Sequence, residues 1–334
     1  MHSHNFACYK RKFINIQRLY DMGENYRLIK KRKILTLEDY VDERVQNKRS
    51  LGKYSTADLY QAAGYHFRNF YGKEDCRLSD LNPTLVADFV HYLQSLRLKT
   101  NTINSYLSSL RAIFNAALQS RIVKVKEHPF SGLKLKREMT AKRAVSVEFV
   151  KKMAAMDFTE DPRLDLAADL SLFSFMAYGM PFIDIVHLKK ENIDGDEIIY
   201  NRHKTGVQIR IKITIGMQIL IDKHKNKGSY LFPVLTDYTG YHGYKSLLAV
   251  HNESLKKIGR LLHIPVKLTS YVMRHTWASE ALRCNIPITV ISQAMGHTSE
   301  KTTRIYLEQL DTSVLNKANK QITGILDVFF QKRE

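Results

Sequence analysis

The stretch that most constrains the fold is residues 268–311, whose sequence has the pattern of three short helices: LTSYVMRHTWASEALRCNIPITVISQAMGHTSEKTTRIYLEQLD. Thr269 or Ser270 can cap the first helix. Pro287 can open the second helix, and Ser299 can cap the third. Side chains on these three helices can therefore come close together.

Three side chains of this segment suit chemistry on a phosphodiester. Arg274 lies on the first helix, and His297 lies on the turn that ends the second. Tyr306 lies about two turns into the third helix. A tyrosine hydroxyl, with a free pKa of about 10, becomes a useful nucleophile when cations stabilise its phenolate and the crowded phosphorane. Arginine offers a fork of donors that matches two phosphate oxygens, and histidine donates to an oxygen or relays a proton.

Each of these residues alone would be read as an ordinary surface or core residue, but their order is more specific. Arg274-His275 is followed by Gly-His-Thr-Ser at 296–299 and by Thr-Thr-Arg-Ile-Tyr at 302–306. This order and spacing resemble the C-terminal signature of the tyrosine recombinase (phage integrase) family. In its details the segment resembles the Bacteroides-type branch, found in mobile elements and invertases.

Composition and charge favour a nucleic-acid partner. The 334 residues include 52 Lys and Arg against 33 Asp and Glu, a net charge of +19, which calls for a polyanion. No stretch approaches the ~20 apolar residues of a membrane span. Three widely spaced cysteines fit reduced thiols, and no metal or Gly-rich phosphate motif is present. We therefore expect no metal, no cofactor and no membrane partner, and a cytoplasmic, nucleoid-associated protein.

The chain divides into five segments by pattern. These are a basic N-terminal arm (1–34), a helical core-binding domain (35–128), a linker (129–145), a catalytic domain (146–311) and a C-terminal helix or tail (312–334). The expected fold is mainly α with a small antiparallel β-sheet. The family resemblance implies a two-domain DNA clamp, built from a SAM-like helical domain and an α+β catalytic domain.

The fourth helix of the first domain is expected to open near Asn101. Residues near its start can grip phosphates through backbone amides and polar side chains. The candidate DNA-binding residues here are Lys99, Thr100, Asn101, Thr102 and Asn104. Ordinary helix capping is the alternative explanation.

In the second domain, helices are expected at about 146–155, 162–178, 181–190 and 244–262. Residues 197–202 and 207–214 have the period-two pattern of two strands. Lys204 lies at the hairpin turn between them, where a solvated lysine is the simplest interpretation. The resemblance implies that this lysine protonates the leaving 5′ oxygen. Arg202 is a further candidate DNA contact.

Two positions depart from the family pattern. Where the family has its first catalytic arginine, this chain has Tyr178 or Pro181. Loss of one donor in an oxyanion hole weakens transition-state stabilisation by about 2.7–4 kcal/mol. Either another residue supplies the missing donor, or catalysis at this site is impaired. Arg202, Arg210 and Lys189 are the nearest substitutes in sequence. The second departure is Tyr271, which replaces a histidine one turn before Arg274 and can still donate a hydrogen bond through its hydroxyl. His275, directly after Arg274, is expected to stabilise the fold.

The combined hypothesis is a metal-independent site-specific DNA recombinase acting through a 3′-phosphotyrosyl intermediate. Its expected catalytic residues are Tyr306, Arg274, Lys204, His297 and Tyr271. A catalytically impaired, DNA-binding relative and a type IB topoisomerase are the alternatives. The expected partner is double-stranded DNA with inverted-repeat sites. The protein should be a monomer when free and a homotetramer in the synapse, where accessory DNA-bending proteins could assist. The sequence does not predict the target site, or integration over excision or inversion.

Overall fold

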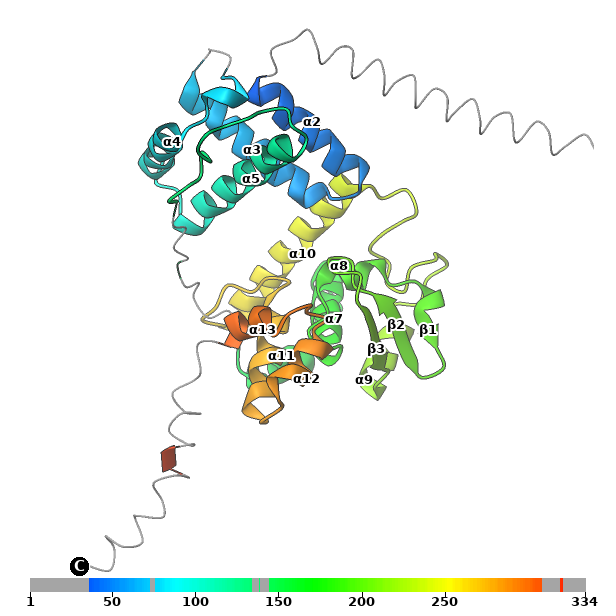
Figure 1. Ribbon diagram of the computed structural model, residues 1–334. Coiled ribbons are helices and arrows are strands. Elements are labelled where there is room, and N and C mark those ends of the chain that lie inside the picture. The colour runs from blue at the N-terminus through cyan, green and yellow to red at the C-terminus, as the bar shows by residue number, and fades with distance from the viewer. Residues whose placement is uncertain (1–35, 73–75, 134–137, 139–143, 308–318, 321–334) are drawn as a thin grey trace, which may run out of the picture. The chain divides into compact units, whose positions relative to one another are not determined.

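The computed structural model describes residues 36–72, 76–133, 138, 144–307 and 319–320 (Figure 1). Side chains are described for these residues except 305–307. The chain divides into two compact units, Met1–Thr140 and Ala141–Glu334. No helix in the described ranges is long and apolar enough to cross a membrane.

The first unit is a small helical domain around one apolar core. Its helices are α2 (Leu37–Ser50), α3 (Tyr54–Tyr71), α4 (Pro83–Ser95) and α5 (Thr100–Gln119), with a 3₁₀ turn at Leu78–Asp80. Asn82 caps α4, because its Oδ1 accepts the Leu85 N–H at 3.0 Å. Gly64 lets α3 approach α2 closely, since a Cβ there would lie 2.7 Å from Val41 Cγ1.

The second unit combines helices with a three-stranded sheet. Its elements are α6 (Val147–Ala155), α7 (Pro162–Met176), α8 (Phe182–His187), β1 (Ile193–Asp194), β2 (Glu197–Asn201), β3 (Gln208–Lys212), α9 (Ile215–Lys223), α10 (Tyr241–Leu261), α11 (Val272–Arg283), α12 (Ile288–Ala294) and α13 (Glu300–Leu307), plus a 3₁₀ turn at Lys190–Asn192. The three short helices expected at 268–311 are confirmed as α11 to α13. Ser299 Oγ accepts the Lys301 N–H at 3.3 Å, as a cap does, but Thr269 and Ser270 do not cap α11, whose N-cap is Tyr271.

The sheet is antiparallel in the order β1-β2-β3. Ile198 pairs with Ile211 and Tyr200 with Ile209, and all four are buried. The predicted period-two pattern therefore places one face of the hairpin against the core.

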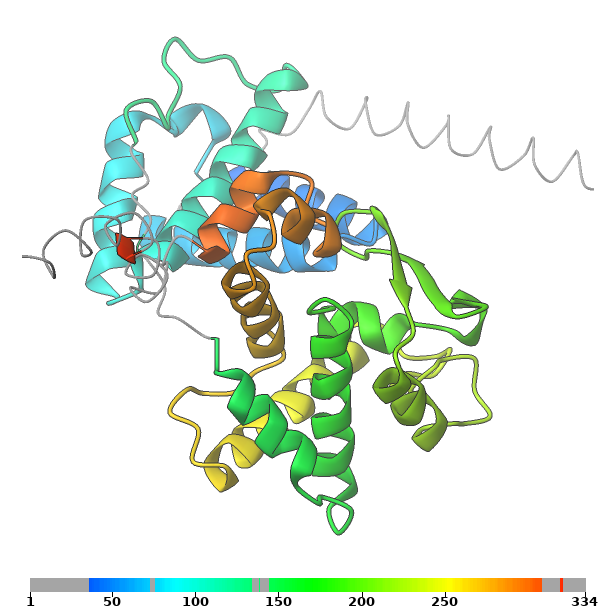
Figure 2. The same ribbon diagram turned by 90° about the horizontal axis from the view of Figure 1, so that it is seen from below.

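Helix α7 is central to this unit. Helices α10 and α11 pack against it on one side, and α9 and the sheet lie on the other (Figures 1 and 2). Helix α7 ends at Met176, and the chain then turns through Tyr178 and Gly179, both at positive φ. This turn and the turn after α12 position the candidate active site.

Candidate active site

Arg274 is the centre of the site. It is only 2% exposed, in the first turn of α11. Its Nη1 donates to Gly179 O at 2.8 Å, and its Nη2 donates to Met295 O at 2.7 Å. A Cβ on Gly179 would lie 2.7 Å from Arg274 Cα, so glycine is required there by both space and a φ of +68°.

His297 contacts Arg274 directly. Its Nε2 lies 3.0 Å from Arg274 Nη2, and its Nδ1 lies 2.8 Å from Thr303 Oγ1 on α13. Desolvation, followed by the charges of Arg274, Arg202 and Lys204, lowers the pKa of His297 to about 4. The imidazole is thus neutral at physiological pH, so Nε2 accepts from Arg274 and the Nδ1–H donates to Thr303.

Lys204 lies on the exposed turn between β2 and β3. After burial and the charges of Arg274 and Arg202, the charge of Lys204 also lowers the pKa of His297. The neighbouring Thr205 Oγ1 donates to Gly296 O at 3.3 Å and so joins the hairpin to the turn that carries His297. Arg274, His297 and Lys204 are therefore brought together.

The tyrosines are placed differently. Tyr271 is 44% exposed at the start of α11. Burial, followed by the charge of Tyr271, raises the pKa of Tyr244 on α10 to about 12. The backbone of Tyr306 belongs to α13, whereas its side chain lies outside the described part of the structure. The ring of Tyr178 packs against Trp277, with centroids 5.5 Å apart. Neither Tyr178 nor the buried Pro181 supplies a cation.

Arg202 differs from the DNA contact expected from the sequence. It is 5% exposed, and its Nη1 donates to Met295 O at 2.7 Å and to Gly296 O at 2.9 Å. Its Nε lies 3.7 Å from Oδ2 of the buried Asp184. Neither Asp184 nor Thr303 was predicted from the sequence as a site residue. Asp184 could have been found, because one carboxylate within the apolar run FIDIV needs a buried partner.

The candidate phosphate contacts of the first unit lie at the start of α5. Lys99 is exposed, and Thr102 and Asn104 are half-buried. Asn101 Nδ2 donates to Glu138 O at 2.8 Å and Asn101 Oδ1 accepts the Glu138 N–H at 3.2 Å, while Thr100 Oγ1 donates to the Glu138 carboxylate. Here the chain's own carboxylate occupies a position suited to a phosphate.

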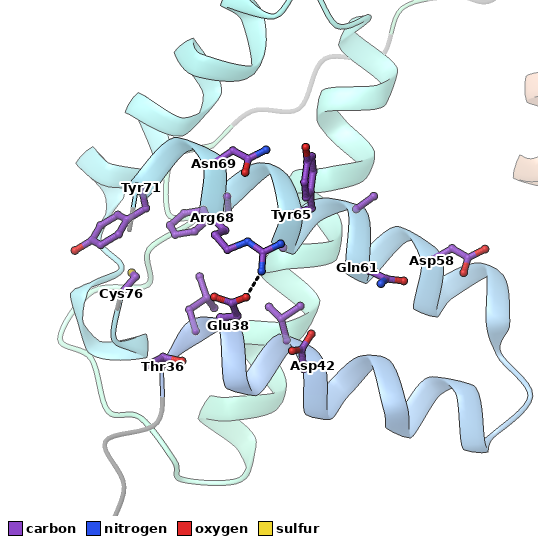
Figure 3. Close-up of a pocket in the computed structure, with 16 residues that line it drawn as sticks. Thr36, Glu38, Asp42, Asp58, Gln61, Tyr65, Arg68, Asn69, Tyr71 and Cys76 are labelled. Atoms are coloured by element: carbon purple, nitrogen blue, oxygen red, sulfur yellow. Dashed lines mark hydrogen bonds and ion pairs between the residues drawn. The ribbon is translucent and has the colours of Figure 1, made fainter. Parts of the chain in front are cut away.

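A pocket of about 1010 Å³ in the first unit lies between α2 and α3 (Figure 3). Its charged lining consists of Glu38, Asp42, Asp58 and Arg68, and Arg68 is paired with Glu38. The excess of carboxylates has the wrong sign for binding a phosphate backbone. The described residues that suit phosphate chemistry therefore lie elsewhere.

Two family models match the chain. The Phage integrase SAM-like domain matches residues 36–136, and the Phage integrase family matches residues 154–313. The chain therefore belongs to the phage integrase family of tyrosine recombinases, as its C-terminal motifs indicated, while its assignment to the Bacteroides-type branch stays a prediction.

Individual relatives agree with this assignment. The tyrosine recombinase XerD of Rickettsia bellii (strain RML369-C) is 22% identical over 306 residues, which span 84% of this chain and 95% of the relative. The integrase of Escherichia phage P2 is 20% identical over 227 residues, or 68% of this chain and 60% of the relative.

Solved structures confirm the predicted fold class. The Tn1549 transposon integrase in complex with transposon right end DNA has a TM-score of 0.61 at 12% identity, covering 87% of this chain and 100% of that chain. A lambda integrase dimer bound to a COC' core site has a TM-score of 0.60 at 17% identity, covering 81% and 95%. A lambda integrase tetramer bound to a Holliday junction has a TM-score of 0.58 at 18% identity, covering 84% and 80%.

Proposed function

We propose that this protein is a tyrosine-type site-specific DNA recombinase whose active site is built on Arg274, His297 and Lys204. The observation that carries the proposal is the convergence of two cationic side chains and a neutral imidazole in a unit that matches the phage integrase family. Fixed donors of this kind stabilise the charge of a pentavalent phosphorane without a metal.

The nucleophile is Tyr306. Position 306 lies three residues after Thr303 on α13 and so shares a helix face with the residue that holds His297. The Tyr306 oxygen attacks the scissile phosphorus, its proton passes to water, and the bond from phosphorus to the 5′ oxygen breaks. Lys204 gives that oxygen its proton, which leaves a 3′-phosphotyrosyl link and a free 5′-hydroxyl. Because the link conserves the phosphodiester energy, the reverse steps join a new strand without a cofactor.

Arg274 and His297 hold the non-bridging oxygens, with Tyr271 as an additional donor. The negative charge of a bound phosphate opposes the cations that lower the pKa of His297. Binding of DNA therefore favours a protonated imidazole that can donate to the phosphate. This predicts proton uptake when the DNA binds.

The substrate we infer is double-stranded DNA with inverted-repeat sites. The charge of +19 and the DNA named in the structures of the transposon and lambda integrases support this inference. The lambda dimer and tetramer support assembly into homo-oligomers on DNA. We place the working protein in the cytoplasm on the nucleoid, as a tetramer in the synapse, with the tail at 312–334 as the segment exchanged between protomers. That segment lies outside the described residues, apart from 319–320.

The test is a covalent-adduct assay on nicked duplexes that tile the DNA flanking the coding sequence. The wild-type protein is expected to form an adduct that survives denaturation on one of these duplexes. Tyr306→Phe should bind the same duplex and form no adduct, whereas Tyr238→Phe, at a 97% exposed tyrosine, should behave as wild type. Adduct formation by Tyr306→Phe would refute the assignment. Binding without any wild-type adduct would favour the architectural alternative.

A further inference from the structure

A buried ion pair joins the β2–β3 hairpin to α8. Asp184 and Arg202 are 3% and 5% exposed, and Arg202 Nε lies 3.7 Å from Asp184 Oδ2. Asp184 Oδ1 also accepts the backbone N–H of His203 at 2.9 Å. Two consecutive hairpin residues, directly before Lys204, are thus fixed to one carboxylate.

The same guanidinium reaches the turn after α12. Arg202 Nη1 donates to the carbonyls of Met295 and Gly296 at 2.7 and 2.9 Å. Arg274 Nη2 donates to the same Met295 carbonyl at 2.7 Å. One backbone oxygen therefore receives a guanidinium from the hairpin and another from α11, two residues before His297.

Gly296 shows how closely these parts fit. Its φ is +62°, and a Cβ there would lie 2.9 Å from Arg202 Cδ and 2.7 Å from Ile209 Cδ1. The turn therefore rests directly on the Arg202 stem and on β3. A change in the position of Arg202 cannot leave the turn in place, because the interior is packed without slack.

The other two cations near in sequence to the missing arginine do not reach this turn. Arg210 pairs with Glu197 at 2.9 Å on the exposed face of the hairpin, and Lys189 pairs with Glu191 at 3.7 Å. Of the three substitutes considered from the sequence, Arg202 is the one whose hydrogen bonds meet those of Arg274.

We propose that Arg202, paired with Asp184, is a positioning residue that holds the His297 turn and the Lys204 hairpin in register around Arg274. The expected effect of Arg202 on the reaction rests on the proposed function, whereas its expected effect on the positions of the two turns does not. It differs from a direct replacement of the missing arginine, because the charge of Arg202 is paired with the buried Asp184 carboxylate, whereas Arg274 also contacts His297. A misplacement of about 1 Å in such a site can cost 10²-fold in rate.

The test removes the pair without leaving a buried charge. Arg202→Met alone would strand the Asp184 carboxylate and could unfold the protein, so the main variant is Arg202→Met with Asp184→Leu. The matched control is Arg210→Met with Glu197→Leu, which removes an exposed pair from the same hairpin. Arg202→Lys retains the charge but lacks the planar fork. Each full-length protein is followed by the NMR titration of the His297 imidazole and by adduct formation on the tiled nicked duplexes.

The proposal predicts that His297 titrates near pH 4 in the wild type and in the control, and closer to its ordinary value in the main variant. Adduct formation should fall about 10²-fold in the main variant and less in Arg202→Lys. A folded main variant with wild-type titration and wild-type adduct rate would overturn the inference. If the wild type forms no adduct, the proposed function fails. The titration of Arg202→Lys, which keeps the charge that lowers the pKa of His297 but loses the planar fork, then decides whether Arg202 holds the turn: a wild-type titration in that variant would overturn the inference.

Discussion

Arg274 is nearly fully buried, and a buried guanidinium is stable only when acceptors replace the water it loses. Gly179 O comes from the turn after α7, and Met295 O and His297 Nε2 come from the turn after α12, more than 100 residues later in the sequence. The residue that we propose to bind phosphate is therefore also the residue that holds these two turns together.

Arg274→Lys tests this dual function. One ammonium cannot reproduce a planar fork that joins Gly179 O to Met295 O and His297. We expect adduct formation to fall by about 10²- to 10³-fold, the cost of one lost donor in an oxyanion site. The measurement is the single-turnover rate on the nicked duplex, and a rate within about threefold of wild type would contradict the proposed contact.

Gly179→Ala tests the turn after α7. The added Cβ would lie 2.7 Å from the backbone of Arg274, at a φ of +68°. Gly195→Ala is the control, since its φ is +60° but nothing lies within 4 Å of its Cβ position. We expect the control to lose about 1 kcal/mol in the free energy of unfolding and Gly179→Ala to lose ~2 kcal/mol more. Equal losses, measured by urea unfolding, would show that the close approach is unimportant.

The sequence predicted the candidate catalytic residues better than it predicted the hydrogen bonds that hold the site together. Arg274, His297 and Lys204 were expected in the site because their spacing matched a family pattern. The burial of Arg202 was not expected, because its acceptors are backbone carbonyls about 90 residues away, and a carbonyl has no sequence signature. Contacts of this kind follow from the packing of elements and not from local pattern.

At the scale of elements, the helices and strands with clear periodicity were predicted well. In β3, Ile209 and Ile211 alternate with polar residues and lie on the buried face of the strand, as expected. Helix α9 (Ile215–Lys223) was missed, because IGMQILIDK continues a run of β-branched residues. The local signal that starts it is Thr214, whose Oγ1 accepts the Met217 N–H at 3.3 Å.

Helix α10 carries a buried histidine that should make stability depend on pH. The His251 ring stacks on Phe182 of α8 at 4.3 Å, and burial lowers its pKa to about 4. The unfolded chain takes up this proton near pH 6.5, but the folded chain does so only near pH 4. The free energy of unfolding should therefore fall as the pH drops through this window, by up to ~3 kcal/mol for His251, with His297 adding in the same direction.

His251→Phe should flatten part of this slope in urea unfolding from pH 7 to pH 4. His242→Phe, at an exposed histidine of the same helix, is the control and should keep it. An unchanged slope in His251→Phe would exclude His251 as its source.

The start of α5 gives a prediction about DNA affinity. The Glu138 carboxylate accepts from Thr100 where we expect a phosphate to bind. Glu138→Gln removes the competing charge, so DNA affinity should rise by roughly 2- to 5-fold, the effect of about 0.3–1 kcal/mol at a helix N-terminus. Glu127→Gln removes an exposed carboxylate that accepts from Ser131, and it should have a smaller effect. Binding curves at fixed salt decide between them, and equal gains would remove α5 as a specific phosphate site.

At the scale of the whole molecule, the chain joins two units with different tasks. The first unit matches the SAM-like domain and the second matches the integrase family. The described residues of the proposed catalytic centre lie in the second unit alone, whereas the charge of +19 belongs to the chain as a whole. We therefore expect DNA affinity to depend strongly on salt and the cleavage step to depend on the second unit.

The most direct measurement of the central claim is mass spectrometry of the covalent adduct. The wild-type protein is trapped on its nicked duplex, digested with trypsin and nuclease, and searched for a nucleotide-bearing peptide. Our account predicts that the nucleotide is attached through its 3′ phosphate to Tyr306, in the peptide spanning residues 305–317. A nucleotide on any other residue, or a bound duplex that yields no modified peptide, would contradict it.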